Sequence, residues 1–215
     1  MGGLVEQQIE QALQALTKAD TRLAEAVIIN DTKVNQFDVA IDEECQHIIA
    51  RRQPAASDLR LVMAVIKTIT DLERIGDEAE KIARMAVRLA NEERPKNNYA
   101  ELQTLGNHVR YMVHDTLDAF ARLDIEAALR IAREDRKIDQ QYEGIMRQMI
   151  TFMMEDPRTI ARALDVIWAA RAIERIGDHA RNICEYIIYL VKGKDVRHTS
   201  LDQIEREILG RKDSE

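Results

Sequence analysis

The chain is poor in turn-forming and aromatic residues. Among its 215 residues there are 8 glycines, 3 prolines and 1 tryptophan, and aromatic residues make up 4%. All-β sandwiches need many tight turns, and collagens or disordered linkers need far more glycine and proline, so these classes are excluded. The chain is instead 46% hydrophobic and 32% charged, with abundant Ala, Leu, Ile, Glu and Arg, which favours long amphipathic helices. We therefore predict an all-α fold.

The chain also lacks long apolar runs, a cysteine framework and an excess of basic residues, and each absence excludes a class of protein. No apolar run approaches the roughly 20 residues that cross a bilayer, and the first residues lack the basic-then-apolar layout of a signal peptide. Two cysteines, Cys45 and Cys184, fall inside helical patterns and predict reduced core thiols in the cytoplasm rather than a disulfide framework or zinc site. The net charge of −7 argues against a dedicated nucleic-acid binder, which needs a basic face. We expect contact with a membrane only through partner proteins.

The sequence repeats itself once. Residues 1–35 match residues 105–139 without gaps, at an offset of 104. Residues 73–77, Glu-Arg-Ile-Gly-Asp, match residues 174–178 at an offset of 101, and the intervening loops can absorb this difference. The identical pairs include Leu13 with Leu117, Asp20 with Asp124, and Asp31 with Asp135. The match predicts two copies of one helical unit.

Each unit is expected to contain three helices. In the first unit we predict a helix over residues 4–29 that bends near Asp20, a second from a cap at Asn30 or Asp31 to about Arg52, and a third over residues 58–90. The expected apolar side of the second helix is Val34, Phe37, Ile41, Cys45, Ile48 and Ile49. The third helix carries a coiled-coil-like stripe of Val65, Ile69, Leu72, Gly76, Ala79, Ala83 and Ala86, repeated in the second unit as Val166, Ala170, Ile173, Gly177, Ala180, Cys184 and Ile187.

Long helices with short connections favour antiparallel bundles. We therefore predict two tandem three-helix bundles, residues 1–93 and 99–193, joined by a polar link over residues 91–98. A C-terminal tail follows over residues 194–215. Its few apolar residues leave open both a short docking helix and a loosely held tail.

Pairs of acidic residues four apart are the candidate functional feature. Glu73 with Asp77, and Glu174 with Asp178, each lie on one helix face and repel each other. Carboxylate oxygens in this array can hold a hard cation together with a facing helix. Candidate partners on the second helices are Asp38 with Asp42 in the first unit, and Asp139 with Glu143 (or Asp135) in the second.

An alternative interpretation needs no metal. The acids can form a solvated row of ion pairs, for example with Arg74 or Lys81. Gly76 and Gly177 recur in register inside helices, where glycine costs about 1 kcal/mol relative to alanine, so they suggest a close approach of two helices. Close packing and metal binding do not exclude each other.

The sequence offers no enzymatic machinery. Glu44 and His47 have the Glu-x-x-His spacing of di-iron bundles, but such bundles need two of these motifs, and the second unit has Gln148 and Thr151 instead. His179 follows Asp178, but its counterpart in the first unit is Glu78, so the repeat does not support it as a ligand. There is no glycine-rich phosphate loop, catalytic triad or zinc-type cysteine pair. We expect neither an enzyme nor an anion-binding pocket.

Four segments resemble the PhoU family of phosphate-specific transport accessory proteins. They are residues 52–60 (RQPAASDLR), 70–77 (TDLERIGD), 153–160 (MMEDPRTI) and 171–179 (RAIERIGDH). The similarity runs from Met1 to about His198. In this family the first helix starts earlier, so the chain is expected to begin partway along it.

The resemblance implies a cytoplasmic regulator. Such proteins act as negative regulators of phosphate uptake and of the phosphate-starvation response. They are thought to bridge the ATP-binding subunit of the phosphate ABC transporter and the sensor histidine kinase. The resemblance also implies a homodimer, and the net charge gives no reason to expect a nucleic-acid partner.

The resemblance also implies multinuclear metal ions, such as Fe, Zn or Mg, on Glu/Asp-x-x-x-Asp motifs. These map onto Glu73/Asp77 and Glu174/Asp178, with Asp38/Asp42 and Asp139/Glu143 as their second-helix counterparts. Alternatives from other classes are a carboxylate-bridged metalloenzyme, a metal-storing bundle, and a bundle whose acids form only ion pairs.

Overall fold

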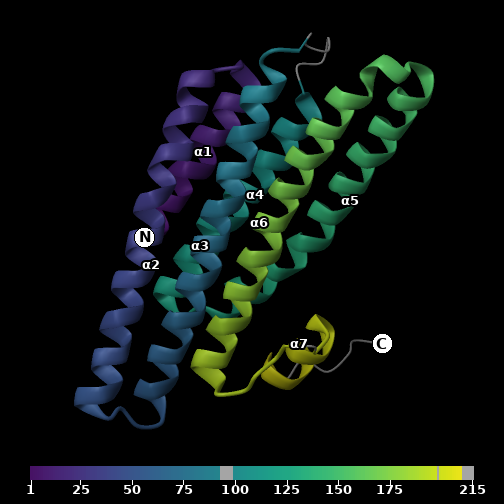
Figure 1. Cartoon of the computed structure of the whole chain (residues 1–215). Helices are drawn as coiled ribbons and strands as arrows, with labels where there is room; N and C mark the ends of the chain where they lie inside the picture. Colours follow the sequence, from purple (N-terminus) through teal and green to yellow (C-terminus); the bar gives the residue numbers. More distant parts are fainter. Residues whose placement is uncertain (93–98, 198, 210–215) are drawn as a thin grey trace, which may run out of the picture.

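The structure is a computed structural model that describes residues 1–92, 99–197 and 199–209. In this part of the chain seven α-helices and one short 3-10 helix form, and no strand. The α-helices are α1 (Gly2–Lys18), α2 (Thr21–Arg52), α3 (Ser57–Leu89), α4 (Ala100–Arg122), α5 (Ile125–Glu155), α6 (Ile160–Lys192) and α7 (Leu201–Leu209), and the 3-10 helix η1 (Pro157–Thr159) joins α5 to α6. The predicted all-α fold is confirmed (Figure 1).

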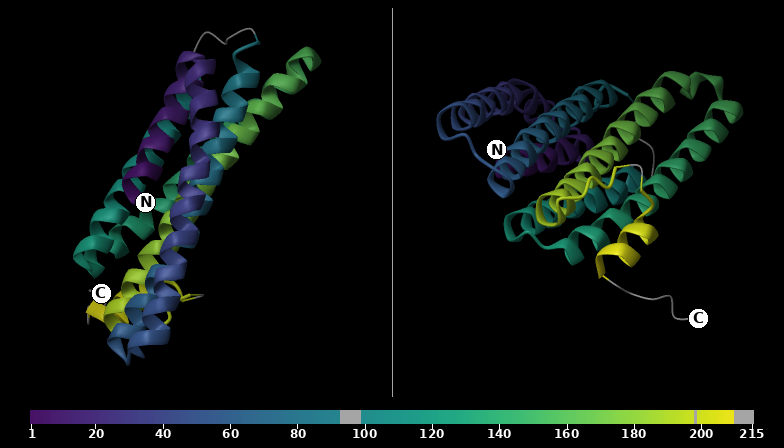
Figure 2. Two further views of the ribbon diagram at one scale, coloured as in Figure 1. Left: turned by 60° about the vertical axis from the view of Figure 1, so that its left-hand side comes forward. Right: turned by 90° about the horizontal axis from the view of Figure 1, so that it is seen from below.

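The six long helices form two layers. In the front layer α2, α3, α6 and α5 lie side by side in this order, and α1 and α4 pack behind them (Figure 1). The views from the side and from below show the same arrangement, with α3 and α6 at its centre (Figure 2). Each predicted unit thus supplies three helices, α1–α3 and α4–α6, and the two sets meet through α3 with α6 and α1 with α4. Residues 93–98 of the predicted link lie outside the described residues.

An aspartate cap marks the same helix boundary in both units. Asp20 accepts a hydrogen bond from the backbone N–H of Leu23 at 3.0 Å, and Asp124 accepts one from Ala127 at 2.9 Å. These aspartates are paired by the repeat, and each caps the second helix of its unit. The predicted boundary at Asn30 or Asp31 is therefore wrong. Helix α2 begins at Thr21, where Asp20 caps its first turn, and it continues without a break through Asn30 and Asp31.

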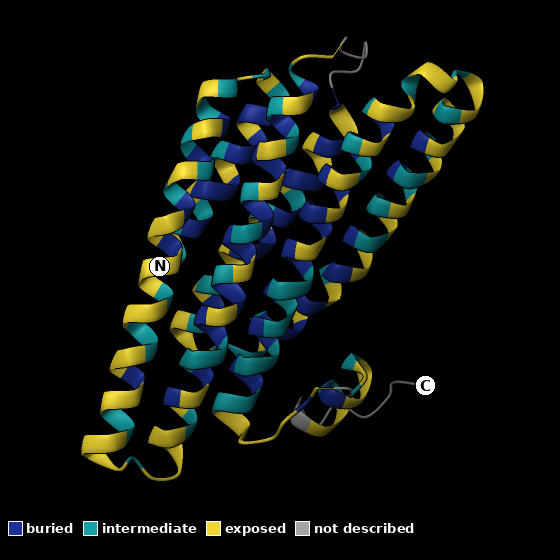
Figure 3. Ribbon diagram, viewed as in Figure 1, coloured by how far each residue is buried: buried dark blue, intermediate teal, exposed yellow. Residues whose placement is uncertain are grey.

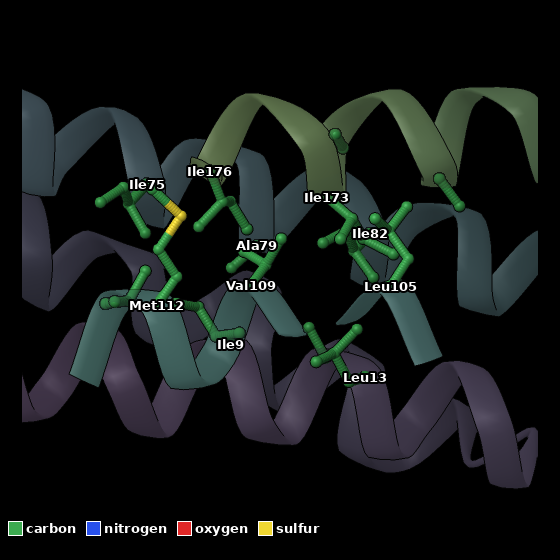
Figure 4. Packing of buried hydrophobic residues seen from close by; sticks show 14 of the residues in the cluster. Ile9, Leu13, Ile75, Ala79, Ile82, Leu105, Val109, Met112, Ile173 and Ile176 are labelled. Atoms are coloured by element: carbon green, nitrogen blue, oxygen red, sulfur yellow. The ribbon is translucent and has the colours of Figure 1, made fainter. Parts of the chain in front are cut away.

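The core is one hydrophobic cluster with members from all six long helices. Ile75 of α3 and Ile173 and Ile176 of α6 lie over Val109 and Leu105 of α4 (Figure 4). The predicted stripe of α6 is buried throughout, and that of α3 is buried except at the half-buried Val65. One core therefore joins both units.

The predicted apolar side of α2 is wrong at Phe37. Its side chain is 48% exposed, whereas Val34 and Cys45 of the same helix are buried. Among the helices that the structure describes, α1 and α3 alone pack closely on α2, and α1 is much shorter. Most residues along the outer side of α2 are consequently exposed (Figure 3).

Helices α1 and α4 pack through a reciprocal contact. A Cβ atom on Gly106 would clash with the Cδ atoms of Leu13, and one on Gly2 would lie 3.2 Å from those of Leu117. The repeat pairs Gly2 with Gly106 and Leu13 with Leu117. Exchange of these partners across one interface shows that the two units are related by an approximate two-fold rotation.

The tail contains the docking helix α7. Ile204 is 1% exposed and packs on Leu129, Ile188 and Val196. Arg133 of α5 pairs with two acids of α7, Asp202 and Glu205. Of the two alternatives for the tail, the docking helix is the one that forms. No helix in the described part of the chain is long and apolar enough to cross a membrane.

Candidate metal centres

The first acidic cluster lies between α2 and α3. Burial raises the pKa of Glu73 above its ordinary value, and the charges of Asp77, Asp38 and Asp31 raise it further, while Arg74 lowers it. Burial also raises the pKa of Asp77, to which Asp31 adds the next largest effect. Carboxylates influence one another in this way only at close range. The structure therefore brings Asp31 and Asp38 of α2 to Glu73 and Asp77 of α3.

The second acidic cluster lies between α5 and α6, and it consists of Asp135, Asp139, Glu174 and Asp178. Glu174 is the most perturbed of the four: burial, followed by Asp178, raises its pKa to about 7, against a lowering by Arg171. Burial and then Asp135 raise the pKa of Asp139 and of Asp178. Both clusters thus combine two acids of the second helix with the Glu-x-x-x-Asp pair of the third.

The glycine of each Glu-Arg-Ile-Gly-Asp motif faces the second helix of its unit. A Cβ atom on Gly76 would lie 3.2 Å from Asp31 Oδ1, and one on Gly177 would lie 3.2 Å from Ile138 Cδ1 and 3.6 Å from Asp135 Oδ1. Both aspartates are buried, at 7% and 4% exposed. The predicted close helix approach at Gly76 and Gly177 is confirmed, and it places a second-helix carboxylate directly against the third helix.

The two clusters differ in their hydrogen-bond donors. Asp31 accepts from two neutral amides, Gln8 at 2.8 Å and Asn35 at 3.2 Å. Its counterpart Asp135 accepts from the charged Arg181 at 2.9 Å. Arg171 also donates to Glu174 at 2.5 Å. The innermost aspartate of the second cluster thus has a charged donor where that of the first cluster has two neutral ones.

The remaining predicted acids lie further out. Burial, and then the charge of Asp42, raises the pKa of Asp38, and Asp42 accepts a hydrogen bond from Gln46 at 2.7 Å. The charge of Glu143 adds a small increase to the pKa of Asp139, which burial and Asp135 raise more. Glu143 is 65% exposed and lies 3.7 Å from Arg147. Each is one helical turn beyond its cluster.

Asp31 is the site residue that our sequence prediction missed, and Asp135 was only an alternative. The gapless match of residues 1–35 with 105–139 pairs these two aspartates, so the signal was present in the repeat. Asp38 has no acidic counterpart, because Tyr142 occupies the matching position. Asp139 corresponds to Asn35. Three acids of each cluster are thus repeated, and the fourth comes from a different turn of the second helix.

The ion-pair interpretation accounts for only part of the geometry. Arg74 lies 3.5 Å from Glu73 and 3.9 Å from Asp77, as that interpretation predicts. Lys81 instead pairs with Glu78, at 2.9 Å. Within the described residues, two buried oxygens of the second cluster, Asp135 Oδ1 and Glu174 Oε2, have no hydrogen-bond partner.

Unpartnered buried oxygens fit a bound cation. An oxygen-only donor set suits a hard cation better than a soft one. In the described part of the chain, however, no three His, Cys, Asp or Glu side chains are already arranged around one metal position. Binding a cation would therefore require small side-chain movements that draw the carboxylates together.

Neither His179 nor His47 belongs to the acidic clusters as defined above. His179 Nδ1 lies 2.7 Å from Asp71 Oδ1, so its ring forms a hydrogen bond with Asp71 of α3. Glu44 and His47 are exposed on α2.

Comparison with known proteins identifies the family. The family model described as "PhoU domain" matches residues 1–86 and again residues 102–187. The chain belongs to the PhoU family. It is 54% identical to the Phosphate-specific transport system accessory protein PhoU of Escherichia coli K12, over all of this chain and 88% of that protein. A homolog from Pseudomonas putida is 54% identical over 98% of this chain and 82% of its own length.

Solved PhoU structures share the fold. The crystal structure of PhoU from Pseudomonas aeruginosa superposes with a TM-score of 0.87 at 52% identity, covering 90% of this chain and 93% of that one. The phosphate transport system regulatory protein PhoU from Streptococcus pneumoniae gives 0.84 at 32% identity, over 91% of each chain. These names describe accessory and regulatory proteins of phosphate transport.

Proposed function

We propose that this PhoU-family chain is a negative regulator of phosphate uptake and of the phosphate-starvation response. The observation that carries the proposal is the 54% identity, over the whole chain, to an accessory protein of phosphate-specific transport. In this role it acts in the cytoplasm as an adaptor between the ATP-binding subunit of the phosphate ABC transporter and the sensor histidine kinase. Binding of the adaptor to the kinase shifts the kinase between two activities.

Exposed apolar side chains near the α5–α6 connection support a role in protein contacts. Met154 is 80% exposed, and Ile150, Ile160 and Leu164 are each more than 40% exposed. They lie within the last two turns of α5 and the first two turns of α6. Groups of exposed apolar residues of this kind mark interaction surfaces. We assign these four residues to contact with one of the two partners.

A reporter of the phosphate-starvation response tests the function in phosphate-replete cells that lack the chain. Reporter output should be high, and supplying the chain should shut it off. The variant L164D should fail to do so at equal abundance, whereas I29D, which also changes an exposed isoleucine to aspartate but on α2, should repress normally. Low output in the absence of the chain would refute the regulatory role.

We also propose that the acidic clusters hold hard cations such as Mg²⁺ or iron ions. Asp135, Asp139, Glu174 and Asp178 would hold the ion of the second cluster, and Asp31, Asp38, Glu73 and Asp77 that of the first. A bound cation would supply positive charge that relieves the repulsion among the carboxylates and ties the second helix to the third. The two unpartnered oxygens of the second cluster support this proposal.

Metal analysis of the purified protein tests these sites. The double variants E73Q/D77N and E174Q/D178N should each lose bound metal, and E143Q, one turn outside the second cluster, should retain it. Metal content that is unchanged in both double variants would contradict the site assignment. Normal repression by the metal-depleted variants would show that the metal is dispensable for regulation.

The alternatives and the oligomeric state need separate measurements. A metalloenzyme or metal-storing bundle predicts turnover of a substrate or uptake of many ions per chain, with no effect on the reporter. We propose a homodimer as the functional form. Sedimentation at several protein concentrations would give twice the mass of 24.7 kDa for a dimer.

A further inference from the structure

A cationic groove lies between the two units, where α3 and α6 pack side by side. Lys81 and Arg88 of α3 and Arg171 and Arg175 of α6 line it, and its volume is about 330 Å³. We call it the inter-unit groove. Four cations thus share one concavity in a chain whose net charge is −7. A volume of this size lies at the lower end of the range of small-molecule sites.

The cations outnumber the carboxylates that hold them. Glu78 is 3% exposed, accepts a hydrogen bond from Lys81 Nζ at 2.9 Å, and forms an ion pair with Arg175, whose Nε lies 3.0 Å away. One buried negative charge therefore fixes two positive ones, and a net positive charge remains. An ammonium has three N–H donors and a guanidinium five, so both cations keep donors for an anion.

The other two cations keep donors as well. Arg88 Nη1 lies 3.4 Å from Asp165, and Arg171 Nη1 donates to Glu174. Their side chains are 65% and 44% exposed, so a ligand from solvent can reach them. Lys81 and Arg88 are two helical turns apart, or about 10 Å. This span exceeds a single phosphate and suits a chain of two or three phosphates.

An aromatic side chain completes the groove. Trp168 lines it, is 61% exposed, and is the only tryptophan of the chain. Met85 adds a further apolar contact from α3. An exposed indole is a stacking surface for a nucleobase, and such stacking contributes about 1–3 kcal/mol per base in single-strand binding proteins.

We propose that the inter-unit groove binds a nucleotide, with its phosphates on the four cations and its base against Trp168. Arginine favours this arrangement because its planar group can hold two phosphate oxygens at once. The groove is assembled from helices about 90 residues apart in the sequence, so no local motif reveals it. This inference is independent of the proposed regulatory function.

Fluorescence of the single tryptophan reports directly on the groove. Metal-free protein in a chelating buffer would be titrated with ADP, adenosine and pyrophosphate, with excitation at the red edge of indole absorption. We expect ADP to quench Trp168 saturably, with half-saturation at or below about 1 mM. Adenosine lacks the phosphates and pyrophosphate lacks the base, so each should bind at least about tenfold more weakly.

Matched variants locate the site. R88Q and R175Q should each weaken ADP binding about tenfold, since each removes a charged hydrogen bond. Arg122 is an exposed arginine of α4 paired with Asp118, and R122Q should leave ADP binding unchanged. By calorimetry, W168A should lose several-fold in affinity, whereas Y111A, which removes an exposed aromatic residue of α4, should not.

Several results would overturn the proposal. They are the absence of saturable quenching by ADP up to about 5 mM, equal binding of pyrophosphate, and equal weakening by R122Q. Saturable quenching by a glutamate-rich peptide but not by ADP would also overturn it, and would assign the groove to an acidic protein segment instead.

Discussion

At the residue scale, Glu174 carries the largest electrostatic cost in the acidic clusters. It is 6% exposed, and burial together with the charge of Asp178 raises its pKa to about 7. The metal-free folded state therefore binds a proton that the unfolded chain releases near pH 4.5. Because the folded pKa lies above the unfolded one, the contribution of Glu174 to stability is most favourable below pH 4.5 and is lost as the pH rises through 7.

Replacing Glu174 with glutamine should remove this loss. In metal-free protein we expect E174Q to gain about 1–3 kcal/mol relative to wild type between pH 5 and pH 8, since each pKa unit corresponds to about 1.4 kcal/mol. Urea denaturation at a series of pH values measures the difference. The control E143Q changes an exposed acid of α5 and should alter stability little at any of these pH values. A constant difference between E174Q and wild type from pH 5 to pH 8 would contradict the burial argument.

The sequence revealed part of the acidic clusters. The Glu-x-x-x-Asp pairs of the third helices were visible because their spacing places both acids on one helix face. The depth of Asp31 and Asp135 was not visible, because it depends on Gly76 and Gly177 letting the second helix approach. Asp42 and Glu143 fit the same spacing rule but lie one turn outside. The spacing within one helix predicts which side chains share a face. Which of these side chains reach the cluster depends on how the helix packs against its neighbour.

At the element scale, two helical glycines differ in how much space surrounds them. Gly144 has no atom within 4 Å of a Cβ placed on it, so G144A should stabilise α5 by about 0.5–1 kcal/mol. Gly106 of α4 faces Leu13 of α1 too closely for a Cβ, and Leu13 is itself buried. Overpacking typically costs 1–3 kcal/mol. We therefore expect G106A to be less stable than G144A by about 1–3 kcal/mol, as measured from denaturant midpoints.

One outcome of that comparison would contradict the close packing of Gly106. Equal stability of G106A and G144A would mean that Leu13 moves aside freely and that the α1–α4 contact is loose. G3A is a second control, because Gly3 also has open space around it. The stability change caused by G3A should resemble that caused by G144A, apart from the difference due to its position in the first turn of α1.

Helix existence was easier to predict than helix boundaries. The stripes of α3 and α6 follow directly from apolar spacing and are buried almost throughout. The boundary between α1 and α2 was misplaced because Asp20 and Asp31 are both good capping residues by type. Asp20 caps, whereas Asp31 is held inside the bundle by Gln8. The choice between them depends on a tertiary contact.

At the scale of the whole molecule, the shared core predicts one unfolding transition. Ile9 of α1 and Ile173 of α6 belong to the same buried cluster and are each 1% exposed. I9A and I173A should each cost about 2–5 kcal/mol. Both should lower the midpoint seen by Trp168 fluorescence, although Trp168 lies only in the second unit. V39A, at an exposed position of α2, serves as the control.

The result distinguishes one cooperative body from two independent ones. If I9A leaves the Trp168 transition unchanged while circular dichroism shows an earlier loss of helix, the two units unfold separately. Coincidence of both probes in every variant supports a single cooperative transition.

The pairing of α3 with α6 also has a consequence for synthesis on the ribosome. Helices α1 and α2 already cover part of α3 when it is made, but α6, which packs on its other side, ends only at Lys192, roughly a hundred residues after Leu89. At translation rates of about 5–20 residues per second, the side of α3 that meets α6 waits about 5–20 s for its partner. The nascent first half is therefore the form of this protein that most needs a chaperone, and slower translation would lengthen its exposure to aggregation.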